Sequence, residues 1–285
     1  MSQSLAAKYE SLKMLAASDL KSPAVGGLLF DMARDGSATL WQQCHKLEMK
    51  SKVRGKEYIA FASGERMSRP FNSALYVEDS SALDLAQAFI NAPTTLSAAD
   101  ATRAAYTIAM SVIGANEVSG VGRKASATFF EVLIGHMVAT AIGVNPSKKV
   151  KMPEDPSILL PTDYVFDLGH KKPKIHLPIK TSTRERVVQA WVHQLVLKTI
   201  FGNKVYRGLL VVISETKGAS KTRIVTEICI PGQIALFQSR IVELERMYYL
   251  DPPERYLALA TAEPMPVDVR PFGDFFAEVK QLTVF

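Results

Sequence analysis

The sequence predicts an α/β or α+β fold, in which a mixed central sheet is flanked by helices and follows a largely helical N-terminal part. The first 115 residues are rich in helical patterns, whereas strand-like and helical segments alternate from Gly120 onward. We therefore expect two parts, a mostly helical one over 1–117 and a layered core over 118–285.

In the N-terminal part, the clearest helix is expected over 97–114. Ser97 is a good N-cap, and an acidic residue follows three positions later, which is the spacing of a capping box. A shorter helix over 81–92 ends at the step into Pro93, because a residue before proline disfavours helical backbone. Short strands are expected around 53–77.

In the core, helices are expected at 123–142, 184–200 and 233–247, and strands at 163–169, 174–181, 208–214, 223–230 and 255–261. A connector rich in proline and lysine covers 145–156. Pro178 lies within the second strand. Because proline cannot donate a ladder hydrogen bond, it predicts an edge or a bulge near Lys180.

The chain has 285 residues, of which 47% are hydrophobic, enough for an ordinary globular core. Its net charge of +6 favours a polyanionic partner, although an acidic membrane surface or no such partner also agrees with it. No run approaches about eighteen apolar residues, so no membrane span is expected. The two cysteines, Cys44 and Cys229, are too few for a disulfide framework, and with no signal segment they predict a cytoplasmic protein.

Other chemistries receive little support from the sequence. A phosphate-binding GxxxxGK[ST] loop is absent, so no nucleotide cofactor is expected. Cys44 and His45 are only neighbours in the chain, which does not indicate a nucleophile with its base. Five scattered histidines and two cysteines do not predict a zinc site.

Asp163 and Lys180 are symmetric about a turn at Lys171–Lys172, so a hairpin folded there would set their side chains about 5 Å apart on one face. Asp167 lies on that face too, because strand side chains alternate with period two. A carboxylate beside a lysine can bind a divalent ion and a phosphate oxygen, which phosphodiester hydrolysis requires. The alternative is a surface salt bridge across the hairpin.

Arg184, Glu185 and Arg186 stand at the start of the next expected helix, where two arginines oppose the helix dipole. Each guanidinium can pair with the O6 and N7 of guanine, and the carboxylate can accept from cytosine N4, which suits G·C pairs in a major groove. The alternative is an exposed, charged helix start. Gln189 and His193 continue the polar stripe that Glu185 begins.

The stretch Lys180-x-x-x-Arg184-Glu185-Arg186-x-x-Gln189 resembles the PD-(D/E)XK type II restriction endonucleases that recognise CCGG, CCNGG or CCWGG cores, and the resemblance covers about 120–200. It implies a restriction-endonuclease-like core and a hydrolase that cuts double-stranded DNA with Mg²⁺ at a palindromic site containing CC and GG. It further implies a homodimer or a dimer of dimers in a prokaryotic restriction-modification system. The N-terminal part would then serve dimerisation or DNA contact.

In that group the second acid of the motif is displaced from the strand to the next helix, and Pro178 stands here in the vacated place. The acid of the first strand corresponds to Asp163, with Asp167 as its competitor, and an upstream helical glutamate corresponds to Glu131. The resemblance thus implies that Asp163 and Glu131 hold Mg²⁺ with one further ligand, for which Asp167 is a candidate. Lys180 would position the attacking water and stabilise the phosphate.

The recognition element of the group corresponds to Arg184, Glu185 and Arg186, which by this resemblance read the outer C·G pairs. Gln189 would either contact bases or only pack. Two rival interpretations remain: a DNA-binding protein on the same fold without catalysis, and a nuclease of repair or mobile-element processing.

The displaced glutamate is the one departure from the group. Where the glutamate would stand, this chain has His193 or Gln194, and Asp167 and Glu185 are further candidates for the role. His193 would coordinate the metal or order a water, and the alternative is a structural histidine. The missing glutamate is what motivates the non-catalytic interpretation.

Overall fold

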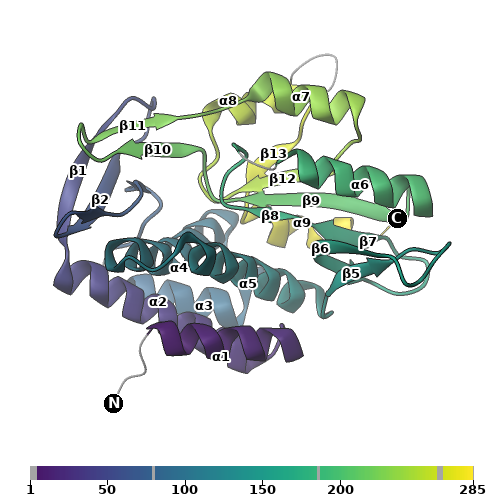
Figure 1. Cartoon of the computed structure of the whole chain (residues 1–285), viewed down its shortest axis with the longest axis horizontal. Helices are drawn as coiled ribbons and strands as arrows, with labels where there is room; N and C mark the ends of the chain where they lie inside the picture. Colours follow the sequence, from purple (N-terminus) through teal and green to yellow (C-terminus); the bar gives the residue numbers. More distant parts are fainter. Residues whose placement is uncertain (1–4, 79–80, 185–186, 262–265, 285) are drawn as a thin grey trace. The chain divides into compact units, whose positions relative to one another are not determined.

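A computed structural model describes residues 5–78, 81–184, 187–261 and 266–284 (Figure 1). The chain forms two compact units: unit 1 comprises Met1–Met137 and Thr216–Ile228, and unit 2 comprises Val138–Glu215 and Cys229–Phe285. This division differs from the expected boundary at 117/118. The first part of a long apolar helix belongs to unit 1, and a hairpin from the second half of the chain pairs with a unit 1 strand.

Unit 1 is largely helical, as predicted. Its helices are α1 (Leu5–Ser18), α2 (Pro23–Gln43), α3 (Ser81–Asn91), the 3₁₀ turn η1 (Pro93–Thr95), α4 (Ala98–Ser119) and the first part of α5 (Arg123–Ile142). Ser97 caps α4, since its side chain accepts from the backbone N–H of Asp100. Helices α2 and α4 approach closely, because a side-chain carbon at Gly36 would lie only 2.7 Å from the carbonyl oxygen of Ser111.

The sheet of unit 1 joins strands from both halves of the sequence. Its strands are β1 (His45–Ser51), β2 (Tyr58–Ser63), β3 (Arg66–Met67), β4 (Phe71–Asn72), β10 (Thr216–Ala219) and β11 (Ile224–Glu227). They run in the order β10-β11-β1-β2-β3, with β4 also paired to β2. Of the strands expected around 53–77, β2, β3 and β4 confirm the part up to Asn72, whereas residues 73–77 form a turn rather than a strand. The strand expected at 223–230 exists as β11, but it pairs in parallel with β1 in this sheet.

Unit 2 contains the mixed sheet that the sequence predicts. Its strands are β5 (Ser147–Lys151), β6 (Leu159–Asp167), β7 (Lys174–Leu177), β8 (Ile179–Lys180), β9 (Tyr206–Val212), β12 (Arg246–Tyr249) and β13 (Val269–Pro271). The order is β13-β12-β9-β7-β6-β5, and β8 also pairs with β9. The β5, β6 and β7 pairings are antiparallel, whereas β7, β8 and β12 all run parallel to β9.

Helices cover both faces of this sheet: α6 (Val188–Phe201), α7 (Pro231–Arg240), α8 (Glu254–Leu257) with the 3₁₀ turn η2 (Ala258–Thr261), and α9 (Asp274–Leu282). Neighbouring residues of a strand point to opposite faces. Tyr249 packs in one core cluster with Trp191 of α6, whereas Tyr248 stacks edge-on against Phe275 of α9. Helix α6 therefore lies on one face and α9 on the other.

Two expected elements of the core are wrong. The strand expected at 255–261 is helical, because Tyr256 and Leu259 are the buried positions while Leu257 is exposed, a spacing of three that suits a helix. The helix expected at 233–247 ends at Arg240 and is followed by β12. The connector expected over 145–156 contains β5, whose lysines alternate with the buried Val150.

Helix α5 is the one helix in the described part of the chain that is long and apolar enough, by length and composition, to cross a membrane. Over Lys124–Ile142, 61% of its most apolar window is buried inside the protein. Its apolar side chains are therefore used largely in packing.

Candidate active site

In the β6–β7 hairpin, the observed register differs by two residues from the expected one. Asp167 is opposite Lys174 and Tyr164 is opposite Leu177, so the position opposite Asp163 is that of Pro178 rather than Lys180. The hairpin is centred one residue earlier than expected, and its turn contains Gly169 and Lys171 with positive φ values of 94° and 62°. A shift of two residues keeps every side chain on its own face, so Lys180 still projects to the side of Asp163.

Pro178 separates β7 from β8 and ends the pairing with β6. Beyond it, the backbone N–H of Ile179 donates to Asp163 Oδ2 at 2.7 Å instead of to a β6 carbonyl. The side chain of Lys180 reaches back to the same oxygen, with Nζ 2.8 Å from Oδ2. The expected meeting of Asp163 and Lys180 is therefore present, and the predicted irregularity at Pro178 produces it.

This acid–lysine pair lies on the wall of a cavity of about 140 Å³. The cavity is lined by Pro161, Thr162, Asp163, His176, Pro178, Lys180, Gln189, Ala190 and His193. Gln189 and His193 are contributed by α6 and lie 3.5 Å apart, Nε2 to Nε2, as the predicted polar stripe requires. Burial lowers the pKa of His193; the Asp163 charge opposes this shift and the Lys180 charge reinforces it, so the site favours the neutral imidazole.

The sequence analysis missed His176, the histidine of β7. It is 1% exposed, and its Nδ1 lies 2.9 Å from Oε1 of Gln194, which in turn donates through Nε2 to the carbonyl of Tyr206 at 2.9 Å. Burial lowers the pKa of His176 to about 4, although the bond to Gln194 opposes this. Period-two alternation from Lys180 would have found it, because residues 176, 178 and 180 share a strand face.

Gln194 is fully buried, and its amide is committed at both ends to His176 and Tyr206. It does not line the cavity beside Asp163, whereas His193 does. Of the two residues expected near the place of the displaced glutamate, His193 is thus the one that faces the acid–lysine pair.

Asp167 lies away from the acid–lysine pair. Four residues along a strand span about 13 Å, and Asp167 is engaged at 2.6 Å by Lys174. The Lys174 hydrogen bond, with a second from the Gly169 backbone, lowers the pKa of Asp167. The expectation that Asp167 shares one metal site with Asp163 is therefore wrong.

Glu131 is half-buried on α5 and belongs to unit 1, whereas Asp163 and Lys180 belong to unit 2. Glu185 and Arg186 lie outside the described residues. Helix α6 begins at Val188 rather than at 184, so Arg184 belongs to the segment that links β8 to α6.

The linking segment is anchored in the core of unit 2 by Thr183. Its backbone N–H donates to Glu215 Oε1 at 2.7 Å, and its hydroxyl lies 3.1 Å from the hydroxyl of Tyr256. The next residue, Arg184, is exposed, and its Nε donates to Ser182 Oγ at 3.3 Å. The segment thus holds a guanidinium at the surface on a fixed backbone.

Glu215 is a buried acid in an apolar setting. Burial raises its pKa to about 7, although hydrogen bonds from Thr183 and from the Tyr249 hydroxyl, at 3.0 Å, oppose the rise. Its Oε2 is buried and has no hydrogen-bond partner among the described residues. The sequence analysis gave no indication of this residue.

The donor set at the cavity suits a hard cation that keeps most of its waters. Among the residues that the structure describes, no three His, Cys, Asp or Glu side chains gather as a metal cluster. Mg²⁺ binds through one or two carboxylates together with waters and substrate phosphates. In this part of the structure both bonds to the Asp163 carboxylate reach Oδ2, which leaves Oδ1 as an oxygen ligand beside the cavity.

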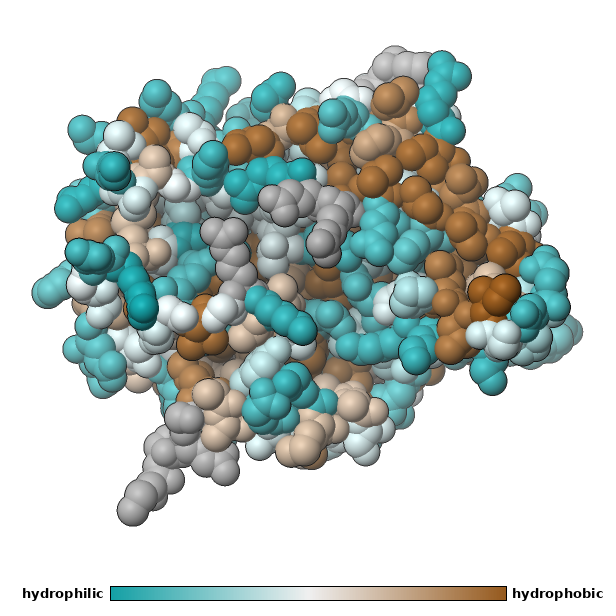
Figure 2. All heavy atoms as spheres, in the orientation of Figure 1, coloured by the Kyte–Doolittle hydropathy of each residue, from teal (hydrophilic) through white to brown (hydrophobic). Residues whose placement is uncertain are grey.

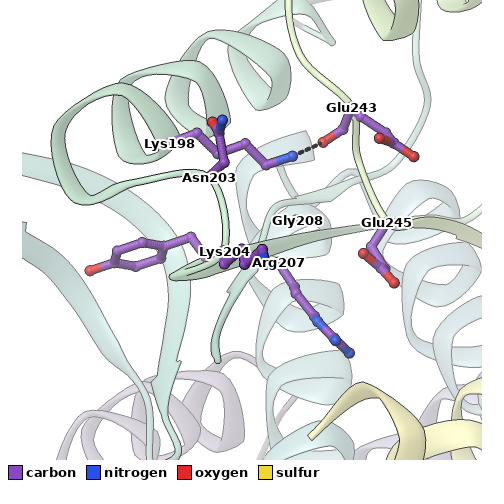
Figure 3. Close-up of a pocket in the computed structure, with 8 residues that line it drawn as sticks. Lys198, Asn203, Lys204, Arg207, Gly208, Glu243 and Glu245 are labelled. Atoms are coloured by element: carbon purple, nitrogen blue, oxygen red, sulfur yellow. Dashed lines mark hydrogen bonds between the residues drawn. The ribbon is translucent and has the colours of Figure 1, made fainter. Parts of the chain in front are cut away.

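A larger cavity of about 320 Å³ lies at the other end of α6 (Figure 3). It is lined by Lys198, Asn203, Lys204, Tyr206, Arg207, Gly208, Glu243 and Glu245. Lys198 donates to the backbone carbonyl of Glu243 at 2.9 Å, which accounts for the placement of its ammonium. The side chains that line this larger cavity carry charges of both signs, so we do not consider the cavity a second candidate for phosphate chemistry.

The comparison with solved structures identifies the fold of the chain as that of a type II restriction endonuclease. The structure is similar to the crystal structure of the Type IIP restriction endonuclease Kpn2I, with a TM-score of 0.82 and 26% identity over 97% of this chain and 96% of that chain. A restriction endonuclease PspGI–substrate DNA complex also matches, with a TM-score of 0.44 and 15% identity over 64% and 79% of the two chains. No family model matches the chain, and no curated protein matches it in sequence. The likeness to Kpn2I confirms the predicted fold class and supports a DNA-cleaving restriction enzyme.

Proposed function

We propose that this protein is a type II site-specific deoxyribonuclease that hydrolyses phosphodiester bonds in double-stranded DNA with Mg²⁺ as cofactor. The observation that carries the proposal is the hydrogen bond between Lys180 Nζ and Asp163 Oδ2 on the wall of a polar cavity. The likeness to Kpn2I over nearly the whole of both chains supports it.

The residues of the cavity suit the steps of phosphodiester hydrolysis. A water oxygen attacks phosphorus and gives up one proton, the bond to the leaving oxygen breaks, and the leaving oxygen takes up one proton, so that one water is consumed for each bond cut. When bound, Mg²⁺ supplies the charge that stabilises the phosphorane and the leaving oxygen. Lys180 positions the water and donates to a phosphate oxygen, while Asp163 orients Lys180 and provides a carboxylate ligand.

Asp163 is the proposed metal-binding carboxylate of unit 2. His193 is the proposed third functional group, because its neutral imidazole lines the cavity and can accept a hydrogen bond from water or bind the ion. Replacing Asp163 with Asn should weaken Mg²⁺ binding, which titration of the ion by calorimetry would measure.

For recognition, we propose that Arg184, Glu185 and Arg186 read G·C pairs in the major groove of a palindromic site containing CC and GG. The exposed Arg184 on an anchored segment supports this role. Gln189 lines the cavity, which supports the proposal that it contacts the same stretch of DNA.

We propose that the protein acts as a homodimer, since each chain carries one acid–lysine pair and a duplex has two strands to cut. An exposed apolar stripe supports this assembly: Val188, Val192 and Leu195 of α6 are 41%, 43% and 40% exposed, at the i, i+4 and i+7 spacing of one helix face. Figure 2 shows an apolar region over the side of unit 2 that carries α6 and α7. The proposed setting is a prokaryotic, cytoplasmic restriction-modification system.

Incubating plasmid DNA with the protein and Mg²⁺ tests the proposal. Discrete fragments with reproducible ends support a site-specific nuclease, and sequencing those ends gives the recognition site and the cut position. A gel shift without cutting would favour the second candidate, a non-catalytic DNA-binding protein. The observation that favours this candidate is that the buried Gln194 is hydrogen-bonded to His176 and Tyr206 and does not face the acid–lysine pair.

A further inference from the structure

His176 is a buried histidine with one bonded ring nitrogen and one without a partner. It is 1% exposed, and only its Nδ1 has a hydrogen-bond partner within the described part of the chain. Leaving a buried polar atom without a hydrogen-bond partner destabilises the folded protein. Such an atom therefore requires an explanation, either in packing or in function.

The neighbours of the ring determine its tautomer. Gln194 Nε2 donates to the backbone carbonyl of Tyr206, and because a carbonyl can only accept, the amide must turn Oε1 toward His176. Oε1 also can only accept, so Nδ1 of His176 carries the ring proton. A neutral imidazole has a single N–H, which leaves Nε2 as a bare acceptor.

This acceptor belongs to a residue that lines the same cavity as Asp163, Lys180 and His193. The ring centroids of His176 and His193 are 6.3 Å apart. A water occupies about 30 Å³, so a cavity of about 140 Å³ has room for several.

We propose that His176 is a positioning residue of the site: its Nε2 accepts a hydrogen bond from a cavity water beside Asp163, and Gln194 holds the ring in the tautomer that allows it. The inference rests on the proposed nuclease function. The pKa of His176, lowered to about 4 by burial, agrees with a ring that accepts a hydrogen bond without taking the proton.

Two substitutions separate the acceptor from the volume of the ring. His176→Gln places an amide oxygen near the position of Nε2, whereas His176→Leu retains apolar bulk and removes the acceptor. In single-turnover cleavage with Mg²⁺, we expect the leucine variant to be about 100-fold slower than wild type and the glutamine variant to lie much closer to wild type. Both should bind DNA as wild type does when Mg²⁺ is absent.

A leucine variant that melts and binds DNA like the wild type but also cleaves at its rate would overturn the proposal. Equal losses of rate in the two variants would do the same, because they would show that the ring acts only by packing.

A second measurement does not depend on activity. In protein labelled with ¹⁵N at histidine, long-range ¹H–¹⁵N correlations distinguish protonated from bare ring nitrogens. We expect one neutral ring with Nδ1 protonated and Nε2 bare, whose signals vanish in His176→Gln. Protonation of Nε2 in that ring would overturn the proposal whether or not the leucine variant folds. Wild-type protein that cuts no DNA would refute the nuclease function separately.

Discussion

Asp163 Oδ2 receives two donors, the backbone N–H of Ile179 and the ammonium of Lys180, at 2.7 and 2.8 Å. The side chains of Lys180 and Asp163 are 21% and 26% exposed, so water screens their attraction and the ion pair adds little to stability. Their arrangement is better explained by chemistry, because the backbone donor fixes the carboxylate and the carboxylate fixes the lysine.

The buried Glu215 leads to a prediction about how the free energy of unfolding depends on pH. Its pKa in the folded protein is about 7 against an ordinary 4.5, so the folded state holds the proton more tightly and the stability that it contributes falls as pH rises from about 4.5 to about 7. Glu215→Gln keeps the Oε1 acceptor but cannot ionise. We expect it to raise the free energy of unfolding at pH 8, by on the order of 3 kcal/mol, and to flatten its pH dependence.

Denaturant unfolding between pH 5 and 8 provides the measurement for Glu215→Gln. The exposed carboxylate of Glu254 offers the matched control, since Glu254→Gln should leave the pH profile as it is in the wild type. A Glu215→Gln variant with an unchanged profile would show that Glu215 is not the buried acid responsible.

Among the elements, helices α4 and α5 were predicted because local signals define their ends, whereas the long helix α2 was not predicted. The Ser97 cap opens α4 and a positive φ at Gly143 closes α5. The register of the β6–β7 hairpin was not predictable, because it depends on the geometry of the turn rather than on any apolar pattern. The contact of Asp163 with Lys180 was nevertheless predicted. It requires only that the two side chains lie on the same face of the sheet and that the long lysine side chain reaches the carboxylate, and a shift of two residues changes neither condition.

The segment between β8 and α6 leads to a prediction about specificity. Arg184→Ala removes an exposed guanidinium from a backbone that Thr183 anchors, so the fold should persist. We expect a loss of about 1–3 kcal/mol in binding of the cognate site and weaker discrimination against substituted G·C pairs. Competition binding with cognate and substituted duplexes measures both.

The matched control is Arg240→Ala, which removes the same charge from the last turn of helix α7 in unit 2. Equal losses of cognate and non-cognate binding in both variants would mean that Arg184 contributes only general attraction to phosphates.

At the scale of the whole molecule, the chain passes from β9 in unit 2 to the β10–β11 hairpin in unit 1 and then returns. Within unit 1 the hairpin is held by parallel pairing with β1 and by an ion pair of 3.0 Å between Lys56 and Glu227. These partners are 171 residues apart in the chain, and no local sequence pattern predicts such a pairing. The expected boundary at 117/118 differs from the observed division for this reason.

The proposed dimer depends on the apolar stripe of α6. Leu195→Lys places a charge within that stripe, where pairing with a second copy would bury it without a partner, and should convert the dimer to a monomer. Sedimentation velocity measures the change. Leu257→Lys, at a leucine of α8 that is 38% exposed, is the control and should leave the assembly intact. A dimer that persists in Leu195→Lys would place the interface elsewhere.

The most direct test of the nuclease assignment compares two lysines of the same strand region. Lys180→Ala removes the partner of Asp163, whereas Lys174→Ala removes the equivalent ion pair with Asp167 at the other end of the hairpin. In single-turnover cleavage of cognate DNA with Mg²⁺, the account predicts no detectable cutting by Lys180→Ala, which still binds DNA, and cutting near the wild-type rate by Lys174→Ala. Wild-type cleavage by a folded Lys180→Ala protein would contradict it.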